Sequence, residues 1–150
     1  MNAALDNNQG LRAHALAQDL RSLLGKIKRR LREQGQVGGL SSSQVSVLLR
    51  LEKDGPATAS SLARAEGMRP QSIVPVIAAL ENAGLVAGTP DPSDGRQTIL
   101  SLTKACRTWL EQGRAARQDW LTRTLQARLS AREQDKLADA VALLKRLVDD

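Results

Sequence analysis

The first quarter of the chain carries an apolar stripe with the period of an α-helix. Apolar residues recur at intervals of three and four positions, while most positions between them are polar or basic. The stripe consists of Leu16, Leu20, Leu23, Leu24, Ile27 and Leu31. This pattern predicts a helix over about residues 9–34, ended by the glycines that begin at Gly35.

Two shorter helices are expected to follow. Ser41 and Gln44 have the spacing of a capping box, in which the hydroxyl and the amide satisfy backbone N–H groups at a helix start. The helix that they open should end at the next Gly-Pro pair. A short helix is then predicted over about residues 59–66, with Leu62 and Ala63 facing inward.

A fourth helix is predicted to start at Pro70 and to end at Gly84, because proline suits a first helical turn and glycine a helix end. Its inward positions are Ile73, Ile77 and Leu80. Pro75 lies inside this helix, where it deletes the hydrogen bond to the Gln71 carbonyl and clashes with it. We expect either a kink at Pro75 or a regular helix that begins near Ser72.

The apolar period then changes to that of β-strands. Two β-prone runs, 85–89 and 97–102, flank the turn-forming residues 90–95, which predicts a hairpin. Helical spacing resumes after Thr103, a candidate N-cap, and a second capping box at Ser130 opens the last helix. The predicted fold is therefore mainly α with a small β-hairpin wing, a helix-turn-helix followed by that wing and flanked by further helices.

Composition narrows the classes of partner. The 150 residues include 22 Lys and Arg against 16 Asp and Glu, a net charge of +6, which favours a polyanion. With two Trp and no Phe or Tyr, a site that stacks single-stranded bases on aromatic rings is disfavoured. Double-stranded DNA is the favoured nucleic acid, because its grooves and phosphates are read without aromatic residues.

Catalysis and metal binding find no support in the sequence. One Cys (Cys106) and one His (His14) cannot supply the three or four ligands of a zinc site. No P-loop, dinucleotide-binding motif or pair of catalytic carboxylates is recognisable, so we expect neither an enzyme nor a cofactor. No run of about 18 apolar residues and no signal-peptide core occur, which predicts a cytoplasmic protein without membrane contact.

The candidate groove-reading residues stand at the start of the fourth helix, at Arg69, Pro70, Gln71 and Ser72. Arg can pair bidentately with guanine and Gln with adenine, and Ser can bind a phosphate at a helix N-terminus. Polar residues are common at helix starts, so the position between a short helix and a hairpin is what favours DNA contact.

The candidate wing residues stand at the hairpin tip, at Asp94, Gly95 and Arg96. Gly95 is expected to supply a positive φ at the tight turn. Arg96 can reach a minor groove or can form an ordinary surface ion pair.

The segment from residue 69 to 103 resembles the MarR-type winged-helix regulators. The resemblance rests on Arg69-Pro70-Gln71-Ser72, Leu80-Glu81-Asn82-Ala83-Gly84-Leu85-Val86, Asp91-Pro92-Ser93-Asp94-Gly95-Arg96 and Leu102-Thr103. Because the flanking helices resemble that family's dimerisation arms, the likeness extends over nearly the whole chain. It implies a single domain over 1–150, with dimerisation helices at 9–34 and 104–150 around a winged helix-turn-helix at 40–103.

The resemblance further implies a homodimeric transcription regulator, most often a repressor, that binds a pseudo-palindromic operator. It also implies that a small-molecule effector can release the protein from this operator. Arg69, Gln71 and Ser72 would then take the groove role and Arg96 the wing role, while Asp94 would brace the wing by pairing with an arginine. Cys106 stands where the family commonly has a glycine. We favour a small buried hydrophobe there over a redox switch.

The outer helices carry more apolar surface than one small core needs, which predicts a dimer interface. Its candidate residues are Leu16, Leu20, Leu137, Val141, Leu144 and Val148. The alternative function is a winged-helix adaptor that binds other proteins and not DNA, since a fold does not determine a function.

Overall fold

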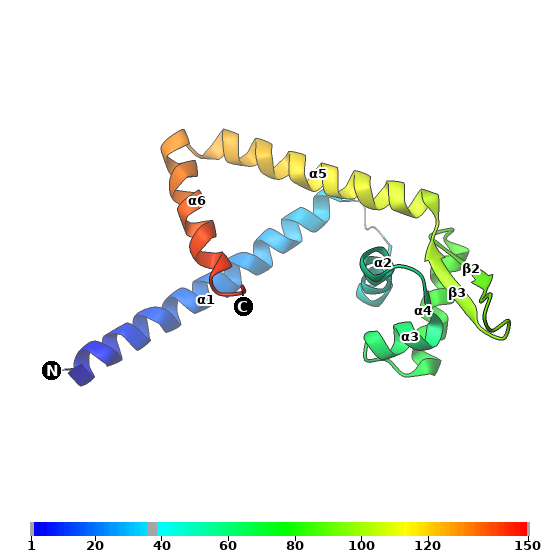
Figure 1. Cartoon of the computed structure of the whole chain (residues 1–150). Helices are drawn as coiled ribbons and strands as arrows, with labels where there is room; N and C mark the ends of the chain where they lie inside the picture. The colour runs from blue at the N-terminus through cyan, green and yellow to red at the C-terminus, as the bar shows by residue number, and fades with distance from the viewer. Residues whose placement is uncertain (1, 36–38, 150) are drawn as a thin grey trace. The chain divides into compact units, whose positions relative to one another are not determined.

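The computed structural model describes residues 2–35 and 39–149, with side chains described from Asp6 onward. Met1, residues 36–38 and Asp150, which the predicted domain range includes, lie outside the described residues. Over the described ranges the chain is mainly helical with one small sheet, as predicted (Figure 1). The elements are α1 (Asn2–Gln34), α2 (Ser42–Asp54), β1 (Ala57–Thr58), α3 (Ala59–Ala65), α4 (Pro70–Asn82), β2 (Val86–Pro90), β3 (Thr98–Leu102), α5 (Lys104–Arg128) and α6 (Ala131–Lys145).

The chain divides into two compact units, which we call unit 1 and unit 2. Unit 1 comprises Met1–Gly35 and Ala115–Asp150, and unit 2 comprises Gln36–Arg114. Unit 2 therefore holds α2, α3, α4, the sheet and the first turns of α5. In it, α3 and α4 form the helix-turn-helix, and the β2–β3 hairpin follows directly (Figure 1).

One cluster of buried apolar side chains forms the core of unit 2. Its members are Val47, Leu48 and Leu51 of α2, Leu62 and Ala63 of α3, Ile73, Ile77 and Leu80 of α4, Val86, Leu100 and Leu102 of the sheet, and Cys106 of α5. Each of α2 and α4 contributes positions three or four residues apart, so each buries one face. The inward positions predicted for α3 and α4 are confirmed.

The sheet has three strands, one more than the predicted hairpin supplies. Its order is β1-β3-β2, and both pairs are antiparallel. In the hairpin Gly88 pairs with Leu100, and on the other edge β1 places Ala57 opposite the same Leu100. A two-residue strand is too short to show an alternating pattern, which is why sequence analysis did not predict β1.

Several helix boundaries follow local capping chemistry. The capping boxes at Ser41 and Ser130 are both formed, with reciprocal side-chain and backbone hydrogen bonds. Gly67 and Gly84, just beyond α3 and α4, have φ values of 64° and 73°. Glycine adopts this left-handed conformation at low cost, and the chain can therefore turn sharply on either side of α4.

The start of α1 differs from its prediction, whereas α4 starts at the predicted proline. α1 begins at Asn2 and not near residue 9, because Gly10 weakens a helix without ending it. α4 begins at Pro70 and runs without interruption to Asn82, so the expected alternative of a start near Ser72 is wrong. The first turn is already formed before Pro75 is reached, and the buried face of α4 continues beyond it.

Candidate nucleic-acid interface

The first turn of α4 presents the predicted groove-reading residues to solvent. Arg69 is the N-cap residue, and its extended backbone carbonyl accepts hydrogen bonds from the N–H groups of Ser72 and Ile73 at 2.9 and 3.3 Å. The Arg69 side chain makes no capping hydrogen bond. Arg69, Pro70, Gln71 and Ser72 are all exposed. The helix start is thus held by its backbone, which leaves the polar side chains available to a partner.

An ion pair fixes the turn that precedes α4. The side chain of Glu66, at the end of α3, is only 12% exposed and accepts hydrogen bonds from Ser46 Oγ and Arg50 Nε at 2.7 Å each. The Arg50 hydrogen bond is the main cause that lowers the pKa of Glu66. Because Ser46 and Arg50 belong to α2, they join α2 to the end of α3. This contact could not be predicted from the sequence, since partners 16 and 20 residues away leave no local pattern.

The aspartates of the β2–β3 loop fold the tip of the wing. The carboxylate of Asp91 accepts hydrogen bonds from the N–H and Oγ of Ser93, which lower the pKa of Asp91. The carboxylate of Asp94 accepts from the N–H of Arg96 at 3.1 Å, and its carbonyl accepts from the N–H of Gln97 at 3.0 Å. Asp94 therefore braces the tip through the backbone, and the expected ion pair with an arginine is not found among the described residues.

The predicted positive φ at Gly95 is wrong. Among the described glycines, positive φ occurs elsewhere, and a Cβ added at Gly95 would meet no atom within 4 Å. Asp94 closes the turn instead, because its side chain and its carbonyl both accept backbone hydrogen bonds. The sterically constrained glycine of the hairpin is Gly88, where a Cβ would lie 2.6 Å from Thr98 Cγ2.

Thr103 joins the end of α4 to the start of α5. Its hydroxyl donates a hydrogen bond to the Gly84 carbonyl at 2.8 Å and accepts one from the N–H of Cys106 at 3.1 Å. Its own N–H donates to the Leu85 carbonyl at 3.1 Å. The predicted N-cap is confirmed, and one side chain connects the end of α4 to α5 at the point where the hairpin closes.

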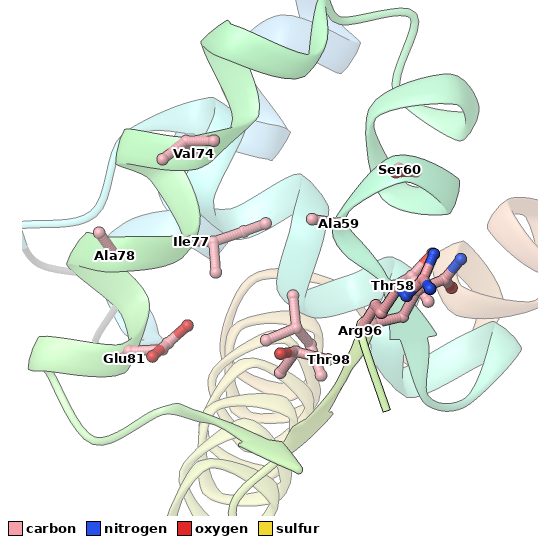
Figure 2. Close-up of a pocket in the computed structure, with 11 residues that line it drawn as sticks. Thr58, Ala59, Ser60, Val74, Ile77, Ala78, Glu81, Arg96 and Thr98 are labelled. Carbon is pink, nitrogen blue, oxygen red and sulfur yellow. The ribbon is translucent and has the colours of Figure 1, made fainter. Parts of the chain in front are cut away.

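A groove of about 540 Å³ lies between α4 and the hairpin. Its lining comprises Thr58, Ala59 and Ser60, then Val74, Ile77, Ala78 and Glu81 of α4, and Arg96, Gln97, Thr98 and Leu100 of the hairpin side. In Figure 2, Val74, Ile77 and Ala78 follow α4, while Arg96 and Thr58 lie across the groove from them. No sequence signal could have found this groove, because its residues come from three separate segments.

The predicted DNA-contacting residues and the predicted dimerisation residues fall in different units. Arg69 to Ser72 and Asp94 to Arg96 all lie in unit 2. The dimerisation candidates lie in unit 1, where Leu16 is 66% and Val148 79% exposed. Unit 2 holds eight Lys and Arg against seven Asp and Glu, so the net charge of +6 resides mostly in unit 1.

Cys106 is fully buried in the core of unit 2, and burial raises the pKa of its thiol. It packs there as a small apolar side chain, as predicted.

Within residues 2–35 and 39–149, no three His, Cys, Asp or Glu side chains are placed to hold a metal ion. No described helix is long and apolar enough to cross a membrane.

Comparison with known proteins agrees with this architecture. The MarR family model matches residues 40–98. An HTH-type transcriptional regulator of Mycobacterium bovis is 38% identical over 135 residues, which cover 90% of this chain and 94% of the relative. The solved structure of a candidate transcriptional regulator from Pseudomonas aeruginosa PA01 is 36% identical, with a TM-score of 0.77 over 91% of this chain and 96% of that one.

A more distant likeness is that to a mutant of MepR from S. aureus, solved with a bound oligodeoxyribonucleotide. It is 20% identical, with a TM-score of 0.71 over 88% of this chain and 97% of that one, and it shows the fold alone. The helix-turn-helix, the hairpin and the similarity to the mycobacterial regulator over 90% of this chain lead to one assignment. This chain belongs to the MarR family and is a winged-helix transcriptional regulator.

Proposed function

We propose that this protein is a homodimeric repressor that binds a pseudo-palindromic duplex operator through α4 and the wing. The observation that carries the proposal is the exposed set Arg69, Gln71 and Ser72 at the start of α4, in the same unit as the wing residue Arg96. Two such helices enter successive major grooves about 34 Å apart in the helix-turn-helix mode. MepR, which shares the fold, was solved with a bound oligodeoxyribonucleotide.

The exposed apolar side chains of unit 1 support the homodimer. Leu16, Leu137, Val141, Leu144 and Val148 are each at least 37% exposed, although helical spacing places them in stripes. Exposed apolar side chains in such numbers are typically covered in an oligomer, and a second copy of the chain supplies a self-complementary partner. Val141→Asp should therefore shift the mass in solution from dimer to monomer.

The groove between α4 and the hairpin supports control by a small molecule. Its volume of about 540 Å³ lies in the range of ligand pockets, and its lining combines apolar side chains with Arg96 and Glu81. A ligand releases the operator only if it binds the DNA-free conformation more tightly than the bound one. A compound that raises the melting temperature and weakens operator binding would identify such an effector.

Fluorescence anisotropy with the intergenic duplex beside the gene tests the proposal. The expected result is tight binding at low salt, with a log–log slope of about −0.9 per phosphate neutralised. The slope then counts the phosphates that Lys and Arg side chains neutralise at the interface. Arg96→Ala should weaken binding while the dimer persists. A dimer that binds no duplex at low salt would instead favour the protein–protein adaptor.

A further inference from the structure

The exposed side of α4 carries apolar side chains beside its polar ones. Ile73, Ile77 and Leu80 turn toward the core, and the exposed positions of α4 include Gln71, Val74, Pro75 and Ala78. Val74 is 60% exposed, although valine is among the residues most often buried. Pro75 has no N–H, and neither Val74 nor Ala78 carries a side-chain polar atom. Gln71 is thus the only one of these four side chains that can form hydrogen bonds with a base edge.

The spacing of this face matches neighbouring base pairs. Residues three apart are neighbours on a helix surface, with about 5–6 Å between their Cβ atoms, so their side chains can contact adjacent base pairs about 3.4 Å apart. When Gln71 contacts one base pair, the side chain of Val74 is therefore within reach of the adjacent pair. Valine presents its two methyl groups in a nearly fixed rotamer within a helix, so it offers a preformed apolar surface.

We propose that Val74 is a specificity-determining residue that contacts the C5-methyl group of a thymine, next to the base pair read by Gln71. In the major groove this methyl group is the feature of a base that an apolar side chain recognises. The inference rests on the proposed operator binding. It adds that each half-site must present a thymine methyl group next to the base pair read by Gln71.

The charges around this face restrict where DNA can approach it. Arg69 precedes the face at the start of α4, and Arg96 lies across the groove, so both can meet phosphates. Glu81, farther along α4, places a carboxylate beside the same groove (Figure 2). Because phosphate repels that carboxylate, base contact is favoured toward the start of α4, which contains Gln71 and Val74.

Thymine-to-deoxyuridine replacement tests the contact, since it removes the methyl group and leaves the Watson–Crick hydrogen bonds unchanged. Duplexes enriched by the protein from a random library are synthesised with each half-site thymine replaced in turn, and the dissociation constants are measured by anisotropy. At one position per half-site, wild-type protein should lose about fourfold in affinity, the equivalent of one buried methyl group. Val74→Ala should bind the thymine duplex more weakly and should lose this dependence on the methyl group.

The outcomes separate this inference from the proposed function. If no duplex is enriched, operator binding itself fails. If a duplex is enriched but no deoxyuridine substitution weakens binding, or if Val74→Ala retains the full penalty, the contact of Val74 with thymine is refuted. Leu49→Ala is the matched control, because Leu49 is 47% exposed on α2, and it should keep the wild-type dependence on the methyl group. Unchanged melting of Val74→Ala would show that both measurements concern folded protein.

Discussion

Replacing Thr103 by valine should destabilise unit 2, although the shape and volume of the side chain stay nearly the same. The substitution keeps the branched side chain and removes the hydroxyl that donates to the Gly84 carbonyl and accepts from the N–H of Cys106. Because the first contact reaches the end of α4 and the second caps the start of α5, the hydroxyl oxygen of Thr103 connects these two helices. The cost should appear in the stability of unit 2 as a whole.

The magnitude follows from these two contacts. Loss of a threonine N-cap costs about 0.5–2 kcal/mol, and loss of one neutral hydrogen bond about 0.5–1.5 kcal/mol. Water can replace part of the bond to Gly84, since that residue is exposed. We therefore expect Thr103→Val to lower the free energy of unfolding by about 2 kcal/mol. Thr103→Ser retains the hydroxyl and should cost less than about 1 kcal/mol.

Urea denaturation followed by tryptophan fluorescence measures the effect. Trp109 packs against the core of unit 2, whereas Trp120 lies in unit 1. In a Trp120→Phe background the fluorescence therefore reports on unit 2 alone. The reasoning would be refuted if Thr103→Val stayed within about 0.5 kcal/mol of the parent, or if Thr103→Ser were equally destabilised.

Three further predictions concern other contacts in unit 2. The hydrogen bond from Arg50 lowers the pKa of Glu66 below its usual 4.5. The stability that the ionised Glu66 supplies is therefore fully present above pH 4.5 and is lost as the pH falls through the lowered pKa. Urea unfolding across the acid range should show a smaller pH dependence in Glu66→Gln. Gly88→Ala should cost about 1–3 kcal/mol through its clash with Thr98, and adding Thr98→Ser should recover most of it, as thermal melting can check. Buried Cys106 should resist thiol reagents, and peroxide should leave operator affinity equal in wild type and Cys106→Ser; a loss confined to the wild type would contradict this.

Local chemistry made much of the fold predictable from the sequence. The capping boxes at Ser41 and Ser130 depend on groups three residues apart, and both form as expected. Pro70 starts α4 and Thr103 caps α5 for the same local reason. Gly95 shows the limit of this reasoning, because a glycine at a hairpin tip permits a positive φ without requiring one.

The candidate interface was predictable only in part. Arg69, Gln71, Ser72 and Arg96 were found as polar residues at a helix start and a hairpin tip, and their contacts with DNA remain predictions. Val74 was missed, because an apolar residue inside a helix is ordinarily assigned to the core. Its exposure could be recognised only after the buried side of α4 was known.

The sequence by itself determined which segments are helical, where most of them begin and end, and that a helix-turn-helix precedes a hairpin. These features arise from contacts among residues a few positions apart. The tertiary structure decided the third strand, the Glu66 contact with α2, and the groove between α4 and the wing. Those features depend on residues that are far apart in the chain and that the shared core brings together. Contacts of this kind produce no periodic pattern in the sequence.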